Sequence, residues 1–288
     1  MTIKTLSILI PTYNDLCIIL VDNLRQQAET AGIDYEIIVA DDGSPHPEQN
    51  QAIGKFPHCT YIMKEKNEGS AATRNFLARQ SRYEWLLFLD SDVSIAHINY
   101  ISKYLSCEYK ADVINGGIDI GGCYPDYLRW RYEKKAEPAH RASSRQTRPY
   151  RQFRSTNFMI RKKTMLQIPF DERFKNSGYE DVLFGKALEQ AHVQVVHIDN
   201  PVTMTSFEDN RQFMEKTERN LRTLHHFRHE LEGYSGIINW SKRPLPAFLL
   251  RTTFRLLDNV LRKNLCGRHP HLLLYNFYRM GYYLNIRT

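Results

Sequence analysis

Two aspartates one residue apart, Asp90 and Asp92, directly follow the five apolar residues 85–89. Carboxylate oxygens are the ligands that Mg²⁺ and Mn²⁺ prefer, and Mg²⁺ typically takes one or two carboxylates together with substrate phosphates. The pair could therefore hold a hydrated divalent cation. A plainer interpretation is a turn that follows a strand and caps the next helix. A D-x-D motif alone does not decide between the two.

A second pair of carboxylates, Glu180 and Asp181, comes just before a predicted helix. The apolar residues that follow have the spacing of one helix face: Leu183, Phe184, Ala187, Leu188 and Ala191. Acidic residues are favoured at a helix N-terminus by capping and by the macrodipole. A helix end that faces a cleft is also a rigid mount for a catalytic base. The sequence leaves both interpretations open.

Polar residues also follow each of three predicted strands. The strands are expected at residues 6–10 (stopped by Pro11), 35–40 and 85–89, and are followed by Thr12 and Tyr13, by Asp41 and Asp42, and by Asp90 and Asp92. Helices are expected between these strands, so the sheet should be mostly parallel with helices on both faces. The carboxyl ends of parallel strands open on one edge, where ligands bind in open α/β sheets.

Two helix starts complete this edge. Asp15 is expected to cap a helix over residues 16–31, with Gly32 as its terminator. Ser70 is expected to cap a helix that begins near Ala71, with Arg74 one turn further on. Free backbone N–H groups at a helix start suit a phosphate. Together, these donors and the strand-end carboxylates predict a nucleotide-diphosphate site.

The rest of the chain is less regular. Residues 125–154 are rich in Arg, Lys, Tyr and Pro without clear periodicity, which predicts a mobile loop, either a lid over the site or an exposed insertion. Residues 193–198 are expected to form the last strand. Two basic helices with aromatic residues are expected at 245–265 and 271–284. Such helices suit an anionic membrane surface, or they form a helical cap packed on the domain.

Composition and charge narrow the class of protein. Of the 288 residues 42% are hydrophobic and 25% charged, which is ordinary for a soluble globular protein. The net charge is +7, and residues 242–288 contain nine Lys or Arg against Asp258 alone. No signal peptide and no run long enough to span a bilayer are recognised. The five scattered cysteines predict reduced thiols in a cytoplasmic protein, and charge alone does not predict a nucleic-acid partner.

Five ordered motifs closely resemble family-2 glycosyltransferases of the GT-A fold. They are residues 7–14 (SILIPTYN), 36–44 (EIIVADDGS), 67–75 (NEGSAATRN), 88–92 (FLDSD) and 179–181 (YED). The resemblance covers roughly residues 3–205. It implies an α/β, Rossmann-like, mostly parallel sheet flanked by helices over residues 1–205 and a helical C-terminal extension over 206–288. Residues 200–202 (NPV) and the aromatic tail also resemble a bacterial subgroup that builds surface polysaccharides.

The resemblance implies roles for single residues. Pro11, Thr12 and Tyr13 would line the nucleobase and ribose, and Asp42 would accept a hydrogen bond from the uracil N–H. Arg74 would lie near the base or diphosphate, and Asp90 and Ser91 would contact the nucleotide. Asp92 with Asp90 would ligate the metal, and Asp181, with Glu180 beside it, would be the general base. The implied reaction is an inverting transfer from a nucleotide diphosphate sugar, UDP-linked, to a glycan or lipid-linked glycan. It would use Mn²⁺ or Mg²⁺ in the cytoplasm, at the inner face of the membrane.

One position departs from the subgroup. Met204 stands where a histidine usually completes the metal site, and a thioether is a poor ligand for hard cations. Either His197, water and diphosphate complete the shell, or metal affinity is weak, or the chain is a catalytically impaired nucleotide-sugar-binding or scaffolding protein at the membrane surface. A nucleotidyltransferase is disfavoured because residues 11–14 are not a Gly-rich phosphate loop.

Overall fold

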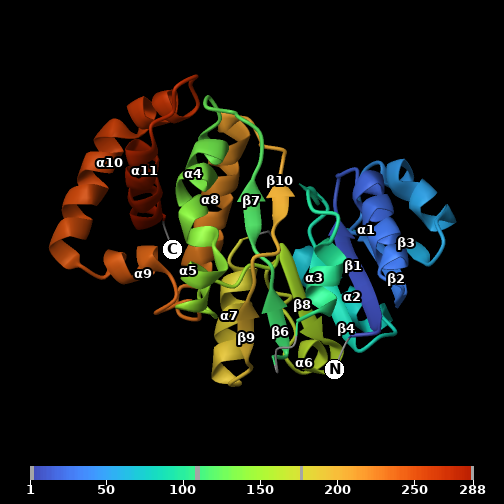
Figure 1. Cartoon of the computed structure of the whole chain (residues 1–288). Helices are drawn as coiled ribbons and strands as arrows, with labels where there is room; N and C mark the ends of the chain where they lie inside the picture. Colours follow the sequence, from blue (N-terminus) through green and yellow to red (C-terminus); the bar gives the residue numbers. More distant parts are fainter. Residues whose placement is uncertain (1–2, 108–110, 176–177, 287–288) are drawn as a thin grey trace. The chain divides into compact units, whose positions relative to one another are not determined.

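The computed structural model describes residues 3–107, 111–175 and 178–286 (Figure 1). The chain divides into two compact units. The first comprises Met1–Gly121, Pro138–Lys175 and Glu180–Ser206, and the second comprises Gly122–Glu137, Asn176–Tyr179 and Phe207–Thr288. The chain leaves the first unit between residues 206 and 207, next to the boundary expected from the sequence. Residues 122–137, however, group with the C-terminal residues.

A seven-stranded sheet forms the centre of the first unit. Its strands are, in spatial order, β3 (Cys59–Met63), β2 (Asp34–Asp41), β1 (Thr5–Thr12), β4 (Trp85–Leu89), β8 (Asn157–Arg161), β6 (Val113–Asn115) and β9 (Val195–His197). β8 is antiparallel to β4 and β6, and the other neighbours are parallel. The sheet is therefore mostly parallel, as predicted.

Helices surround this sheet in the first unit. They are α1 (Ile18–Thr30), α2 (Ser70–Gln80), α3 (Tyr100–Leu105), α5 (Ala142–Gln146), α6 (Lys162–Gln167) and α7 (Glu180–Gln190), with the 3₁₀ segments η1 (Pro47–Lys55) and η2 (Glu137–His140). Leu86 and Phe88 of β4 join a core cluster with residues of α2, α6 and α7. Leu87 and Leu89 point to the opposite face, since side chains alternate along a strand, and all four are fully buried. The unbroken apolar run thus reflects a strand that is covered on both faces.

The first strand and helix differ from the sequence expectation. β1 continues through Pro11 to Thr12, because its pairing with β4 ends at Leu9 and a residue without an N–H is tolerated where one side of the strand has no ladder partner. α1 begins at Ile18 with Cys17 as its N-cap residue, so Asp15 does not cap it. Gly32, at φ +63°, follows the helix end as predicted.

The prediction of an irregular loop over residues 125–154 was wrong, because α4 (Leu128–Ala136) and α5 lie within it. Arg145 on α5 is 3% exposed and donates to the carbonyl oxygens of His140, Asn115, Gly116 and Ile198. Bonds from a buried guanidinium, rather than an apolar face, hold α5 in place. Such bonds leave no hydrophobic period in the sequence.

Residues 193–198 contain β9, but β9 is not the last strand. β10 (Val202–Met204) follows and joins a three-stranded sheet, antiparallel to β5 (Val93–Ser94) and parallel to β7 (Ile118–Ile120). In this register Met204 lies opposite Val93. The second sheet therefore brings residue 204 beside the residue that follows Asp92.

The second unit is helical. It consists of α4, α8 (Asn210–His226), α9 (Gly236–Ser241), α10 (Pro244–Leu265) and α11 (Leu272–Asn285), and α10 and α11 lie side by side (Figure 1). Its core includes Leu128, Met214, Phe254, Leu265 and Tyr278. Across the residues that the structure describes, no helix combines the length and the apolar character needed to cross a membrane.

Candidate functional site

The three predicted strand ends meet at one edge of the sheet. β1 pairs in parallel with both β2 and β4, so Thr12 lies opposite Asp41 and the end of β4 opens on the same edge. The chain continues this pairing for one more residue, since the Asp42 N–H donates to the Thr12 carbonyl at 2.9 Å. Thr12 is buried, whereas Tyr13 is 49% exposed.

Asp42 is fixed by three hydrogen bonds. Its carboxylate accepts from Lys64 Nζ at 2.6 Å and from the backbone N–H groups of Glu68 and Gly69 at 3.1 and 2.8 Å. Asp42 thereby ties the end of β2 to the loop that precedes α2. A carboxylate offers about four lone-pair sites, so these bonds leave room for one further donor. Acceptance from a uracil N–H stays a prediction.

Gly69 allows this loop to enter α2. Its backbone has φ +95° and ψ +158°, a region that is essentially restricted to glycine. A Cβ at this position would lie 2.7 Å from the carbonyl oxygen of Lys175. Ser70 is the first helical residue rather than the cap that the sequence predicted.

Arg74 connects the two carboxylate pairs. Its Nη2 donates to Asp90 Oδ1 at 2.6 Å, and its Nη1 lies 3.7 Å from Glu180 Oε1. The guanidinium also lies over the ring of Phe170, 5.5 Å from its centroid. Although Arg74 is 3% exposed, its Nε and Nη1 have no hydrogen-bond partner within the described part of the chain. Buried donors without acceptors are costly, which makes an anion such as a diphosphate a fitting partner.

Glu180 and Asp181 begin α7, as predicted. Glu180 is buried and accepts from Ser70 Oγ at 3.4 Å. The Asp181 carboxylate accepts from the Val182 N–H at 2.8 Å. Burial, and then the neighbouring Glu180 charge, raise the pKa of Asp181 to about 7. A carboxyl group that titrates near neutral pH is matched to general-base catalysis.

The D-x-D residues have different surroundings. One carboxylate oxygen of Asp90 accepts from Arg74, and the Asp90 side chain is 28% exposed. Ser91 is buried and donates to Asp15 Oδ2 at 2.9 Å. Asp92 is half-buried, one residue before β5. The pair suits a cation whose remaining ligands come from a diphosphate.

A closed metal site built from protein groups alone is not found in the described residues, where no three His, Cys, Asp or Glu side chains cluster suitably. Met204 is 8% exposed in β10. The suggestion that His197 completes the shell was wrong. Its Nδ1 lies 2.6 Å from Arg145 Nη1 and its Nε2 lies 2.9 Å from the Pro149 carbonyl oxygen. Burial lowers the pKa of His197 to about 4, so it is a neutral, packed histidine.

Sequence reasoning missed two residues that position this edge. Lys64 directly follows β3, so the rule that polar residues follow strand ends would have found it. Asp15 was assigned to a helix cap but instead accepts from Ser91. No local pattern could have shown that partner, because the two residues are 76 positions apart.

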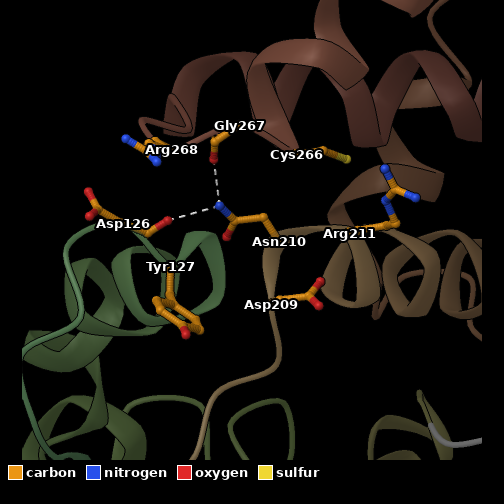
Figure 2. A pocket seen from close by; sticks show the side chains of 8 residues that line it. All are labelled: Asp126, Tyr127, Asp209, Asn210, Arg211, Cys266, Gly267 and Arg268. Atoms are coloured by element: carbon orange, nitrogen blue, oxygen red, sulfur yellow. Dashed lines mark hydrogen bonds between the residues drawn. The ribbon is translucent and has the colours of Figure 1, made fainter.

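Cavities in the second unit are lined by other residues. One, of about 620 Å³, is lined by Asp126, Tyr127, Asp209, Asn210, Arg211, Cys266, Gly267 and Arg268, and Figure 2 shows the Asn210 amide between the chain at Asp126 and at Gly267. Another, of about 670 Å³, includes Tyr179, Trp240, Leu250, Phe277 and Arg279 in its lining. None of the residues predicted to act in catalysis or nucleotide binding lines either cavity.

Three solved structures resemble the fold across nearly the whole chain. A mannosyltransferase from Pyrobaculum calidifontis, in complex with GDP-Man and Mn²⁺, matches with a TM-score of 0.59 and 14% identity over 97% of this chain and 84% of that one. A fragment of S. aureus TarS matches with a TM-score of 0.54 and 17% identity over 97% and 89%. The same fragment in complex with UDP-GlcNAc gives 0.52 and 16%, over 97% and 89%. These are glycosyltransferases of the GT-A fold, and this chain shares that fold.

Sequence comparison points the same way. An uncharacterized glycosyltransferase from Haemophilus influenzae is 39% identical over 89 residues, which are 30% of this chain and 29% of the relative. The match therefore spans less than a third of that relative. The family described as Glycosyl transferase family 2 matches residues 7–171, more than half of the chain, and includes Asp42, Arg74, Asp90 and Asp92. The chain is a member of glycosyl transferase family 2.

Proposed function

We propose that this protein transfers a sugar from a nucleotide diphosphate sugar, UDP-linked, to an acceptor hydroxyl with inversion at the anomeric carbon. The observation that carries the proposal is the position of Arg74. Its guanidinium contacts Asp90 of the D-x-D pair and also approaches Glu180, the residue before Asp181. These contacts support a donor site and a proton acceptor in the same part of the first unit.

On the donor side, cleavage of the glycosyl–phosphate bond leaves a nucleoside diphosphate whose negative charge grows as the bond breaks. Charges and donors aimed at that site stabilise the transition state. The buried Nε and Nη1 of Arg74, which have no hydrogen-bond acceptor in the described part of the chain, support a role in holding the diphosphate. Mn²⁺ or Mg²⁺, when bound, would counter the phosphate charge, with Asp92 and Asp90 as the residues that would hold it. Tyr13, Thr12 and Pro11 are proposed to line the nucleobase and ribose, with Asp42 and Ser91 close by.

On the acceptor side, Asp181 is the proposed general base. The acceptor oxygen bonds to the anomeric carbon on the face opposite the leaving diphosphate, while its proton passes to the Asp181 carboxylate. The electron pair of the broken bond leaves with the phosphate oxygen. One displacement of this kind inverts the anomeric centre and needs no covalent intermediate. The raised pKa of Asp181 supports this role, because a stronger base accepts the proton more readily.

The acceptor class is proposed from the resemblance and from the basic, aromatic C-terminal residues. A glycan or lipid-linked glycan destined for surface polysaccharide or glycolipid would be met in the cytoplasm, at the inner face of the membrane. Two of the similar structures hold GDP-Man or UDP-GlcNAc. They support a nucleotide sugar as donor without selecting the sugar.

The deciding experiment measures release of UDP from UDP-sugars with Mn²⁺ and an acceptor. Asp181→Asn should lower turnover by at least about 100-fold, as expected for loss of a general base, while UDP binding by calorimetry stays within twofold of the unchanged protein. Glu189→Gln, on the same helix, is the matched control and should retain full turnover. Turnover retained by Asp181→Asn would refute the base assignment.

Met204 favours one alternative, a catalytically impaired protein that binds nucleotide sugars or serves as a scaffold. It predicts that the unchanged protein binds UDP-sugar but releases no UDP with any donor or acceptor tested. Turnover that responds to Asp181→Asn would exclude this alternative.

A further inference from the structure

α10 carries apolar side chains on two opposite faces. Ala247, Phe254, Leu261 and Leu265 are buried, and the last three belong to the core of the second unit. Residues seven apart lie almost in line on a helix of 3.6 residues per turn, so these four side chains form one face. This is the face by which α10 packs on its own unit.

The opposite face of α10 is apolar as well, but it is exposed. Leu256 lies two residues, or about 200°, from Phe254. The exposed apolar side chains in line with it are Leu245, Leu249 and Val260, and the four are between 59% and 79% exposed. Phe248, 65% exposed, borders them. We call these five residues the outer stripe. A group of exposed large apolar side chains on one helix face marks an interaction surface.

Basic side chains are exposed on the same helix. Lys263, seven residues after Leu256, continues the line of the outer stripe. Arg255 lies about 100° to one side, with its Nε donating to Asn285 Oδ1 at 2.7 Å. Arg251 is exposed further round the helix. The acidic residue of α10, Asp258, lies 3.4 Å from Arg262 and is thereby partnered. An apolar stripe beside unopposed cations is complementary to anionic headgroups above an apolar interior. It is less suited to a second copy of α10, which would bring further arginines without a free carboxylate.

α10 is held so that the outer stripe faces away from its unit. At its C-terminal end the Asn210 amide donates to the carbonyl oxygens of Gly267 at 2.7 Å and Asp126 at 2.9 Å (Figure 2). Arg262 forms an ion pair with Glu218 of α8, and the Glu218 carboxylate also accepts from Tyr278 at 2.8 Å. The outer stripe thus lies on a helix whose opposite face and C-terminal end are held by the rest of the second unit.

We propose that the outer stripe of α10 docks on an anionic lipid surface, with its leucines among the acyl chains and the exposed cations of the helix at the lipid phosphates. α10, 22 residues and about 33 Å long, buries one face in its own unit and is not apolar enough to cross a membrane, so it would lie in the plane of the interface. This inference deepens the proposed function by placing the enzyme beside a lipid-linked acceptor. Docking itself does not require turnover.

The test uses the full chain and sedimentation with vesicles of phosphatidylcholine alone or mixed with phosphatidylglycerol. The unchanged protein should bind the mixed vesicles, and Leu249→Gln with Leu256→Gln should weaken binding by more than about 100-fold, since each buried leucine contributes more than a factor of ten. The matched control is Ile19→Gln with Ile98→Gln, two exposed residues of the first unit at 87% and 93%, which should bind as the unchanged protein does. Arg251→Gln with Arg255→Gln should weaken binding at low salt and flatten its salt dependence.

Three results would overturn the docking proposal. These are equal vesicle binding by the stripe variant and its control, no binding of the unchanged protein to anionic vesicles, and a dimer in light scattering that only the stripe variant dissociates. UDP release with a soluble acceptor is measured in parallel. The stripe variant should retain it, so a failure of docking is separated from a failure of the proposed reaction.

Discussion

Arg74 is the residue on which the chemistry of the first unit converges. It is buried, contacts Asp90 and Glu180, and has two nitrogens, Nε and Nη1, without a hydrogen-bond acceptor among the described residues. Lysine cannot reproduce this arrangement, because an ammonium is a point charge rather than a planar fork. The identity of this side chain should therefore matter as much as its charge.

We expect Arg74→Lys to lower kcat/KM with the UDP-sugar by roughly 10- to 100-fold, which corresponds to the loss of one or two hydrogen bonds to a charged group. Arg79→Lys is the matched control, because Arg79 lies on the same helix with its side chain 55% exposed. Steady-state kinetics and UDP calorimetry check the result. Equal kinetics in the two variants would remove Arg74 from the donor site.

The raised pKa of Asp181 predicts a pH dependence. The base is inactive when protonated, so kcat/KM should rise with pH and level off above about 7. The contribution of Asp181 to the free energy of unfolding should change with pH in the opposite direction. Because burial raises the folded-state pKa above the unfolded value, the stabilisation that Asp181 contributes is complete at acidic pH and is lost as pH rises toward 7. Asp181→Asn should remove this slope from denaturant titrations, and an unchanged slope would assign it to other groups.

Met204 offers a gain-of-function test. β10 places it beside Val93, the residue after Asp92. Met204→His would add an imidazole, a better ligand for Mn²⁺ than a thioether. The Mn²⁺ concentration for half-maximal turnover should fall about tenfold, or about 1.4 kcal/mol. Met204→Leu is the control and should leave that concentration unchanged. A histidine variant with the same metal response would show that residue 204 lies outside the metal site.

At the scale of elements, the loop before α2 positions both Asp42 and Arg74. Gly69→Ala should lower the free energy of unfolding by about 1–3 kcal/mol because it forces alanine into a glycine-only backbone conformation. The contact between the added Cβ and the Lys175 carbonyl should increase this loss further. Gly32→Ala is the control, since Gly32 also has a positive φ but open space around its Cβ position. It should cost about 1–2 kcal/mol. Urea denaturation measures both, and equal losses would exclude the steric contribution.

The elements also explain what sequence could predict. Apolar runs and polar strand ends located β1, β2 and β4, and with them Asp42, Asp90 and the start of α7 at Glu180. α5 escaped prediction because buried Arg145 holds it through carbonyl oxygens, which leave no periodic pattern. The antiparallel direction of β8 is set by tertiary pairing rather than by local propensity. The Arg74–Asp90 contact likewise joins elements whose spacing no single-sequence pattern encodes.

At the scale of the whole molecule, donor binding should appear as increased thermal stability. A ligand at about 100 times its Kd stabilises the native state by about 2.7 kcal/mol, which should raise Tm by roughly 5–10 °C for a unit of this size. UDP-sugar with Mn²⁺ should exceed GDP- and dTDP-sugars in this shift. Asp92→Asn should reduce the part of the shift that depends on Mn²⁺. Identical shifts for all three nucleotides would contradict the proposed preference for UDP.

The helical unit is assembled from separate stretches of chain, with α4 contributed by Gly122–Glu137 and the remaining helices by Phe207–Thr288. Leu128 is fully buried in that unit, and Arg129 forms an ion pair with Glu208. A chain shortened at residue 206 would therefore leave the apolar side chains of α4 exposed and prone to aggregation. During synthesis on the ribosome, α4 emerges about 80 residues before α8, and it can pack only after the C-terminal helices have been made. The C-terminal helices therefore depend on α4 for their core and are unsuited to deletion or grafting as a module.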